Sequence, residues 1–320
     1  MSRLSVVFLD RATIPTQIQL KVPEFDHEWI EYDFTQPEQV SERIASADIV
    51  ITNKVVLNAD NLTGADKLRL VAVSATGVNN VDLSYCAQAK IAVTNIQGYA
   101  TQSVPEHVIA MLFALKRNLV GYHQDIKEGE WQRHKQFCFF THSIQDVAGS
   151  TLGVIGSGGL GQATAALAKS LGMNVMFADR KGAEQCREGY LPFELVMQLA
   201  DAITLHCPLT AETHNLIGER ELNMMKPSSV LINAGRGGLV DEEALVCALK
   251  ERCIAGAGVD VFTQEPADES NVLIKNMDMP NLLLTPHVAW GSDSSIQNLS
   301  DILIDNLNAF AQGLSKNRVI

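Results

Sequence analysis

The sequence has little of what marks a secreted, disulfide-stabilised or membrane-inserted protein. Its six cysteines include no CxxC pair, which is the spacing of many zinc and redox sites. We therefore expect reduced thiols in a cytoplasmic protein, and no metal site. No apolar run approaches the ~20 residues of a membrane helix, and the amino terminus lacks a secretory signal pattern. The cysteines are Cys86, Cys138, Cys186, Cys207, Cys247 and Cys253.

Positive charge is also scarce. The chain has 25 Lys and Arg against 37 Asp and Glu, a net charge of −12 with a pI near 5.1. This balance argues against partners that are recognised by a basic face, namely nucleic acids and anionic membranes. Hydrophobic residues make up 46% of the 320 positions, and that length predicts two domains, each able to bury its own core.

Short apolar segments alternate with helical patterns along the whole chain, in two series. Several of the segments are continuous apolar runs, as expected of parallel strands buried on both faces. Two such series predict two doubly wound, Rossmann-like α/β domains. The expected strands are 5–10, 29–34, 48–53, 70–75 and 91–95, then 151–155, 174–178, 202–205, 230–233, 256–261 and 282–285; among the expected helices are 39–46 and 82–90.

The join between the two series contains a strong helical pattern. Residues 103–119 carry apolar side chains on one stripe, and Pro105 suits a first helical turn. We expect residues 121–149 to be irregular, and 302–310 to form a helix after the last strand. That helix packs on one of the two domains, and the pattern alone does not say which.

A glycine-rich turn follows the strand at 151–155. It reads Gly156-Ser157-Gly158-Gly159-Leu160-Gly161 and leads into a helical stretch from Gln162 to Leu171. In a GxGxxG turn, the first glycine permits the tight bend, the second lets backbone approach a pyrophosphate, and the third lets the helix approach the strand. The sequence therefore predicts a dinucleotide-binding turn at the amino end of a helix.

An acidic residue, Asp179, ends the next expected strand. A carboxylate there can accept hydrogen bonds from the adenosine ribose and would repel a 2′-phosphate, which favours NAD over NADP. Arg180 follows directly and favours NADP instead, since an arginine can bind a 2′-phosphate.

Three polar residues lie at or just after the ends of later strands, where ligands bind in such sheets. Arg236 can grip a carboxylate, and His287 can give a proton to a carbonyl oxygen as hydride reaches the carbon. Glu265 can stabilise the imidazolium from behind. Taken singly, Arg236 equally suits a surface turn, Glu265 a solvated loop and His287 a structural role.

Several strings resemble the signature of the D-isomer-specific 2-hydroxyacid dehydrogenases, in the order that the family has them. The resemblance covers nearly the whole chain and implies NAD-dependent oxidoreductase chemistry on small 2-hydroxy and 2-oxo acids. It implies a flavodoxin-like substrate domain at 1–98 plus 288–320, an NAD-binding Rossmann domain at 99–287, and a cleft between them. The strings are the glycine turn, 206–210 (HCPLT), 233–245 (NAGRGGLVDEEAL), 258–266 (GVDVFTQEP) and 285–289 (TPHVA).

The resemblance also implies the residue roles. Arg236 binds substrate, His287 is the acid/base and Glu265 is its partner. The implied cofactor-binding residues are Gly156, Gly158, Gly159, Leu160, Gly161, Asp179, Arg180, Cys207, Pro208, Thr213, Ala234, Gly235, Asp260, Ser103 and Val104. The implied substrate-binding residues are Asn53, Thr76, Gly77, Val78, Arg236, His287 and Trp290. Pro105 stands where the family more often has alanine, and we expect a local effect only.

Within the family, shorter strings resemble the glycerate dehydrogenases, also called hydroxypyruvate reductases. These strings are 129–131 (GEW), 137–140 (FCFF), 144–153 and 287–290 (HVAW). The resemblance implies reduction of hydroxypyruvate to D-glycerate, with glyoxylate as a second substrate, and a homodimer formed near the helix at 103–119. Trp131 and Trp290 suit the closure of a small pocket, although Trp131 equally suits core packing or a dimer contact.

Two alternatives remain open. The first is another member of the family, such as a 3-phosphoglycerate dehydrogenase, against which the absence of a further domain after Ile320 counts moderately. Lactate, formate and phosphonate relatives share the same three polar residues. The second is a non-catalytic, NADH-sensing scaffold like the corepressor relatives of this fold, which keep these residues and bind protein partners.

Overall fold

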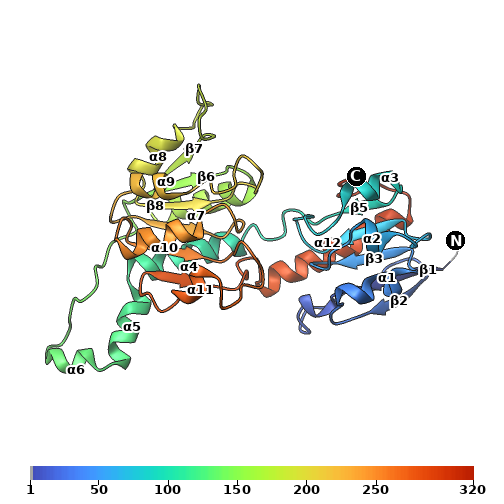
Figure 1. The fold of residues 1–320 in the computed structure, drawn as a ribbon, viewed down its shortest axis with the longest axis horizontal. Coiled ribbons are helices and arrows are strands. Elements are labelled where there is room, and N and C mark those ends of the chain that lie inside the picture. Colours follow the sequence, from blue (N-terminus) through green and yellow to red (C-terminus); the bar gives the residue numbers. More distant parts are fainter. Residues whose placement is uncertain (1–2) are drawn as a thin grey trace. The chain divides into compact units, whose positions relative to one another are not determined.

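The computed structural model describes residues 3–320. Two compact units make up the chain (Figure 1). The first unit runs to Tyr99 and resumes at Gly291–Ile320, and the second unit spans Ala100–Trp290. Each unit contains one all-parallel sheet covered by helices, so the expectation of two doubly wound α/β domains is confirmed.

The first unit has a five-stranded sheet in the order β2-β1-β3-β4-β5. This is the flavodoxin-like order, in which β1 lies between β2 and β3. Residues of β3, β4 and β5 are buried throughout, which explains why these segments read as continuous apolar runs. The strands are β1 (Leu4–Phe8), β2 (His27–Glu31), β3 (Ile49–Thr52), β4 (Leu70–Val73) and β5 (Ala92–Thr94).

The last helix of the chain, α12 (Asp293–Ala311), belongs to the first unit and contacts β4. The side chain of Ser292 caps its amino end by accepting a hydrogen bond from the Ser295 N–H. The predicted helix at 302–310 is therefore the second half of a longer one. The other helices of this unit are η1 (Arg11–Thr13), η2 (Pro37–Gln39), α1 (Val40–Ile44), α2 (Ala59–Leu62) and α3 (Leu83–Gln88).

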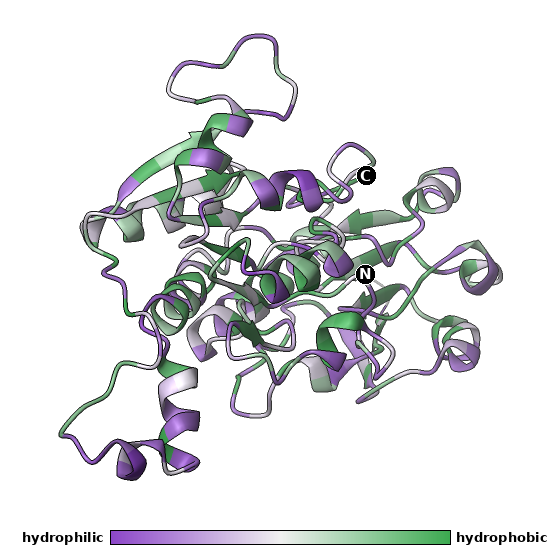
Figure 2. Ribbon diagram, turned by 60° about the vertical axis from the view of Figure 1, so that its left-hand side comes forward, coloured by the Kyte–Doolittle hydropathy of each residue, from purple (hydrophilic) through white to green (hydrophobic). Residues whose placement is uncertain are grey.

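The second unit has a six-stranded sheet in the order β11-β10-β9-β8-β6-β7. The strand order reverses at β6, which leads into the glycine turn and lies between β7 and β8. Hydropathy colouring shows the strands of both sheets as predominantly hydrophobic (Figure 2). The strands are β6 (Thr151–Ile155), β7 (Asn174–Ala178), β8 (Ala202–Leu205), β9 (Val230–Asn233), β10 (Gly256–Val259) and β11 (Leu282–Leu284).

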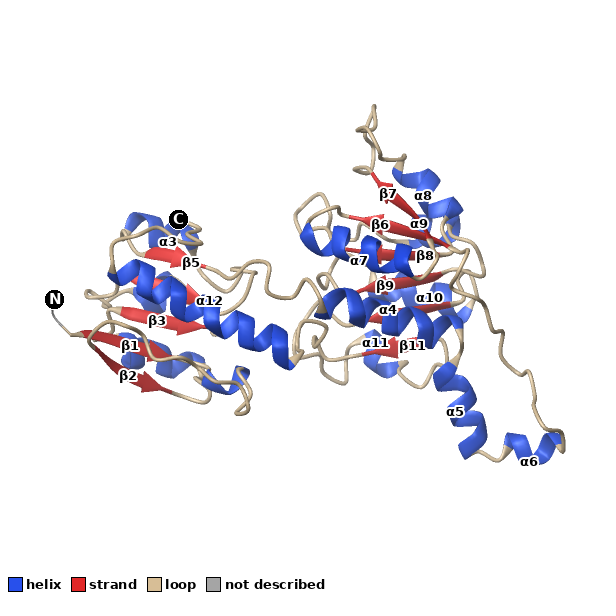
Figure 3. Cartoon of the chain, turned by 180° about the vertical axis from the view of Figure 1, so that it is seen from behind, coloured by secondary structure: helices blue, strands red, loops and turns tan. Residues whose placement is uncertain are grey.

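Two helices of the second unit, α4 (Ser103–Lys116) and α7 (Gly159–Ser170), lie side by side across its sheet (Figure 3). Helix α4 contacts β9 and β10, and α7 contacts β6 and β7. No helix among the described residues is both long enough and apolar enough to cross a membrane. The remaining helices of this unit are α5 (Leu119–Lys127), α6 (Glu130–His134), α8 (Phe193–Leu199), α9 (Glu219–Met224), α10 (Glu242–Lys250) and α11 (Val272–Lys275).

The segment at 103–149 differs from the prediction in two ways. The helix ends at Lys116 rather than at 119, because Asn118 adopts a left-handed backbone with φ of 49°. Residues 121–149 are not irregular throughout, since most of α5 and all of α6 fall within this range. These two helices form an arm that projects from the second unit (Figure 1). The buried Lys116 holds the loop that leads back from the arm, because its Nζ donates to Gln145 Oε1 at 2.7 Å.

Candidate active site

The glycine turn after β6 has the shape that a pyrophosphate requires. Gly156 has φ of +95°, and a Cβ there would overlap the backbone of Cys207. A Cβ at Gly161 would overlap the carbonyl oxygen of Gly156, so α7 packs closely on the strand only with glycine at this position. By contrast, nothing lies within 4 Å of a Cβ built at Gly158 or Gly159, which leaves open space beside the turn.

Helix α7 begins at Gly159, directly beside this open space, and Leu160 lies in its first turn. Its amino end has no side-chain cap, so the N–H groups of the first turn remain available to an anion. The turn also lies at the carboxyl end of β6, where the strand order reverses. The residues present therefore fit the diphosphate of a dinucleotide.

Asp179 follows β7 and is buried, with its side chain 4% exposed. Its carboxylate accepts hydrogen bonds from the Arg180 N–H at 2.8 Å and from the Arg187 N–H and Nε at 2.7 and 2.9 Å. These bonds, led by the one from the Arg187 side chain, lower the pKa of Asp179 to about 2. The acid expected to face the adenosine ribose is thus ionised and already paired.

The loop after β8 packs against the glycine turn. Burial lowers the pKa of His206 to about 4, so its imidazole is neutral near pH 7. Burial also raises the pKa of the Cys207 thiol, which is an unreactive lining group rather than a nucleophile. Thr213 closes the following turn, since its hydroxyl donates to the Pro208 carbonyl at 2.7 Å.

A histidine and a glutamate are in contact at the carboxyl end of the second sheet. His287 Nδ1 lies 2.7 Å from Glu265 Oε2, and the other oxygen of Glu265 accepts from the Phe262 N–H at 3.0 Å. An ionised carboxylate only accepts hydrogen bonds, so Nδ1 carries the proton and Nε2 remains the nitrogen that can exchange one. The His287 side chain is 26% exposed, which leaves it accessible to a substrate.

Asp260 holds the backbone of this histidine loop. Its fully buried carboxylate accepts from the Val288 N–H at 2.9 Å, the Ala289 N–H at 3.0 Å and the Thr285 hydroxyl at 2.5 Å. The Asp260 carbonyl accepts from the His287 N–H at 2.7 Å. His287 itself is left-handed, with φ of 54°, and these bonds hold it in that uncommon conformation.

The segment that follows β9 packs directly against the one that carries Glu265. A Cβ at Gly237 would overlap the carbonyl oxygen of Phe262, so only glycine permits this approach. Arg236 is half-buried in the same segment, and its Nη1 donates to the Gly235 carbonyl at 2.7 Å. Asn233 fixes the turn by accepting from the Gly235 N–H at 3.1 Å, with Ala234 between them.

Helix α4 contacts the far side of the histidine loop. The Ser103 hydroxyl donates to the Trp290 carbonyl at 3.2 Å, and Val104 beside it is buried. Trp290 Nε1 donates in turn to the His287 carbonyl at 3.0 Å. The remaining tryptophan of interest, Trp131, is in α6 on the arm, where its Nε1 donates to the carbonyl of Gln136.

The expected substrate residues of the first unit lie at the carboxyl edge of its sheet. Asn53 follows β3, and its N–H donates to the buried carboxylate of Asp10 at 2.9 Å. The Thr76 hydroxyl donates to the Ile96 carbonyl at 2.7 Å and so fixes the segment after β4. Among the described residues, the N–H groups of Gly77 and Val78 donate to no other group, as suits a segment that binds an anion.

Three residues of these sites were not predicted. Asp10 ends the expected strand at 5–10 and lies two residues after β1, so the strand-end signal that identified the other polar residues could have found it. His107 lies in α4, with Nε2 3.0 Å from the Thr285 hydroxyl, but the two are 178 positions apart in sequence. Arg187 lies in a polar loop whose sequence has no periodic pattern.

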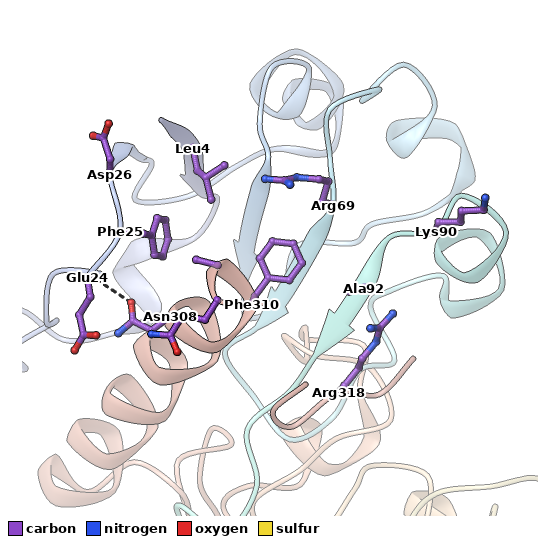
Figure 4. Close-up of a pocket in the computed structure, with 12 residues that line it drawn as sticks. Leu4, Glu24, Phe25, Asp26, Arg69, Lys90, Ala92, Asn308, Phe310 and Arg318 are labelled. Carbon is purple, nitrogen blue, oxygen red and sulfur yellow. Dashed lines mark hydrogen bonds between the residues drawn. The ribbon is translucent and has the colours of Figure 1, made fainter. Parts of the chain in front are cut away.

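The first unit also has a hollow of about 940 Å³ at the amino edge of its sheet (Figure 4). Leu4 and Ala92 begin strands there, and Arg69 precedes β4. None of the predicted site residues lines it. In doubly wound sheets ligands bind at the carboxyl edge, where Asn53 and Gly77 lie.

Comparison with known proteins agrees with this geometry. The model of the D-isomer specific 2-hydroxyacid dehydrogenase NAD binding domain matches residues 109–289, more than half of the chain. The glycerate dehydrogenase of Methylorubrum extorquens is 45% identical over 315 residues, which cover 98% of each protein. The hydroxypyruvate reductase of Blautia hydrogenotrophica is 34% identical over 325 residues, or 99% of each.

A solved structure shares the whole fold. It is a D-lactate dehydrogenase from Aquifex aeolicus complexed with NAD and lactic acid, 27% identical, with a TM-score of 0.80 and 96% of both chains covered. The glycine turn, the paired His287 and Glu265 and these matches lead to one conclusion. This chain belongs to the NAD-dependent D-isomer-specific 2-hydroxyacid dehydrogenases.

Proposed function

We propose that this dehydrogenase reduces hydroxypyruvate to D-glycerate with NADH, and glyoxylate to glycolate as a second reaction. The observation that carries the chemistry is the 2.7 Å contact between His287 and Glu265, which provides a proton donor with a charged partner. The choice of substrate is supported by the names of two relatives, glycerate dehydrogenase and hydroxypyruvate reductase, which match nearly the full chain.

His287 delivers the proton in this reaction. NADH, when bound, would supply the hydride for the carbonyl carbon, and Nε2 of His287 would give a proton to the carbonyl oxygen. Glu265 holds Nδ1 and stabilises the imidazolium before the transfer. Because Asp260 fixes the loop backbone through the Val288 and Ala289 N–H groups, the imidazole is held in place before substrate arrives.

The substrate carboxylate needs donors that carry no competing negative charge. We assign it to the free N–H groups of Gly77 and Val78 and to the guanidinium of Arg236, which also polarises the carbonyl. The first unit is then the substrate domain and the second the NAD-binding domain. Asn53, Thr76 and Trp290 are assigned to the same substrate set, and the remaining predicted residues of the second unit, except Asp260, to the cofactor. Asp260 is fully buried and acts through the histidine loop that it holds.

The test is a comparison of initial rates of NADH oxidation by the purified protein. Hydroxypyruvate, glyoxylate, pyruvate and 3-phosphohydroxypyruvate are the substrates. We expect kcat/KM for hydroxypyruvate to exceed the others, with glyoxylate second. Activity confined to 3-phosphohydroxypyruvate would make the protein a 3-phosphoglycerate dehydrogenase. NADH binding without turnover of any of the four would favour the scaffold alternative.

The role of His287 has its own test. We expect His287→Ala to lower kcat by ~10²–10⁴-fold, the usual contribution of a general acid, with NADH binding retained. His107→Ala is the comparison, because His107 reaches the same loop through Thr285 but is not assigned to proton transfer. A kcat for His287→Ala close to wild type across the pH range would eliminate His287 as the acid.

We also propose that the enzyme is a homodimer, joined through the arm. Helix α4 itself is largely buried within the second unit, whereas many apolar side chains beyond it are exposed. Several exposed apolar side chains in one short segment are typical of a protein interface. We expect Phe137→Asp with Phe140→Asp to convert a dimer to a monomer in light scattering; a wild-type monomer would contradict the proposal. The exposed residues are Leu119, Val120, Ile126, Trp131, Phe137, Phe140 and Ile144.

The six cysteines are all unpaired. Free thiols are typical of proteins kept in a reducing compartment, and we assign the enzyme to the cytoplasm on that ground. Full activity in the presence of a thiol reductant is the expected result, and inactivation by the reductant would contradict the assignment.

A further inference from the structure

The loop between β7 and α8 folds back onto Asp179. Residue 179 and Leu191 close the base of this loop, because the Asp179 N–H donates to the Leu191 carbonyl at 2.9 Å. From within the loop, Arg187 reaches Asp179 with its backbone N–H and with Nε, and Nη2 lies 2.8 Å from the same carboxylate. Asp179 is therefore not a bare negative charge.

A second contact ties the same loop to the glycine turn. The Arg187 guanidinium lies over the Tyr190 ring, with Cζ 3.9 Å from the ring centroid. The Tyr190 hydroxyl donates to the hydroxyl of Ser157 at 2.5 Å, and Ser157 lies between the first two glycines of the turn. A continuous set of contacts thus runs from the phosphate-binding turn to the carboxylate that faces the adenosine ribose.

The arrangement of Arg187 leaves part of its charge available. Nε donates to Asp179 Oδ1 and Nη2 lies 2.8 Å from the same oxygen, whereas Nη1 has no hydrogen bond within residues 3–320. The Arg187 side chain is 54% exposed. A guanidinium that neutralises Asp179 and keeps one edge free can donate hydrogen bonds from that edge to a phosphate, while its bonds to Asp179 remain.

We infer that Arg187 lets this enzyme bind NADPH as well as NADH, by pairing with Asp179 and presenting Nη1 to the 2′-phosphate. An unpaired carboxylate at this position would repel that phosphate. With NADH, the ribose hydroxyls donate to the oxygens of Asp179, and the same ion pair remains. The inference concerns cofactor binding only, so it stands or falls independently of the substrate proposed above.

Neighbouring cations are less suited to this role. Lys181 Nζ is engaged by Glu221 Oε1 at 2.9 Å and by the Leu216 carbonyl at 3.3 Å. Arg180 is adjacent to Asp179 but contacts it only through the backbone N–H. Arg180 is the rival candidate, because no hydrogen bond or ion pair within residues 3–320 holds its side chain away from a phosphate.

The experiment measures cofactor binding without substrate. NADH and NADPH are titrated into the full-length protein, and binding is followed by nicotinamide fluorescence. We expect the wild-type Kd for NADPH to lie within about tenfold of that for NADH. Arg187→Gln should raise the Kd for NADPH about tenfold more than the Kd for NADH, since a charge-assisted contact to phosphate is lost.

Three further variants make the result specific. Arg220→Gln removes the same charge from α9, where Arg220 lies 4.0 Å from Glu194, and should leave the ratio of the two Kd values unchanged. Arg187→Lys should restore part of the NADPH binding. The inference is overturned if wild type binds NADPH more than about a hundredfold more weakly than NADH. Equal weakening of both cofactors by Arg187→Gln, or a larger loss of NADPH binding in Arg180→Gln, would overturn it as well.

Discussion

At the scale of single residues, the site depends on one charged pair and one uncommon backbone conformation. His287 adopts a left-handed φ of 54°, which costs a non-glycine residue of order 1 kcal/mol or more. Hydrogen bonds from the loop backbone to Asp260 offset that cost. The result places Nδ1 against Glu265 at 2.7 Å, so the strained residue is the one to which we assign the proton transfer.

Glu265→Gln tests the charge of this pair. The one oxygen of glutamine can still accept a hydrogen bond from Nδ1, but the side chain carries no charge to stabilise the imidazolium, and its NH₂ group then faces the Phe262 N–H. We expect kcat to fall about 10–100-fold, with little change in NADH binding, in steady-state and titration measurements. Glu243→Gln, at an exposed position of α10, is the matched control and should behave as wild type. An unaltered kcat in Glu265→Gln would mean that the carboxylate only orients the ring.

At the scale of elements, a buried aspartate at a strand end organises a functional loop in each unit. In the second unit Asp260 follows β10 and holds residues 285–289. In the first unit Asp10 follows β1, and its carboxylate accepts from the N–H groups of Asn53 and Lys54 at 2.9 and 2.7 Å. Neighbouring parallel strands end at the same edge, so one carboxylate there can satisfy several loop N–H groups.

Asp260→Asn is expected to loosen the histidine loop. An amide offers one acceptor oxygen instead of two, and its NH₂ group would face a backbone N–H. We expect the free energy of unfolding to fall by about 2–3 kcal/mol in urea titrations, and kcat to fall with it. Asp241→Asn is the control, because Asp241 caps α10 and asparagine caps equally well. Equal stability in the two variants would show that Asp260 does not hold the loop.

At the scale of the whole molecule, acid stability depends on a histidine outside the catalytic pair. Burial lowers the pKa of His206 to about 4, whereas an exposed histidine titrates near 6.5. Between these values the unfolded chain binds a proton that the folded chain does not. His206 therefore contributes stability that is fully present above pH 6.5 and is lost as the pH falls through about 4.

His206→Gln should flatten this dependence. Between pH 6.5 and about 4, His206 accounts for a loss in the free energy of unfolding on the order of 3 kcal/mol, because one pKa unit corresponds to about 1.4 kcal/mol. Urea midpoints at several values between pH 7 and 4 measure it, with the exposed His123→Gln as control. Asp179, whose pKa is about 2, titrates below this range and does not interfere. If the urea midpoints of wild type and His206→Gln fell equally with pH, His206 would not be the source of the acid sensitivity.

The sequence by itself determined the two parallel sheets and the glycine turn, because buried parallel strands and a GxGxxG turn are local patterns. It also placed Arg236, Glu265 and His287 near strand ends, and the structure brings Glu265 and His287 into contact. The hydrophobic pattern left open which unit holds α12; the family resemblance implied the first, and the structure places it there. Only the tertiary structure decided that Asn118 ends α4 early. These features depend on partners distant in sequence, or on a single left-handed residue, and neither leaves a periodic pattern.

The same reason explains the residues that were not predicted. Arg187 meets Asp179 because the loop closes at Leu191, and His107 meets Thr285 because α4 packs against β9 and β10. Local pattern therefore shows which residues form strands, turns and helix starts. Packing decides which charged group neutralises another, and with it the cofactor choice expected of this enzyme. Packing also decides which histidine is buried, and with it the expected acid stability.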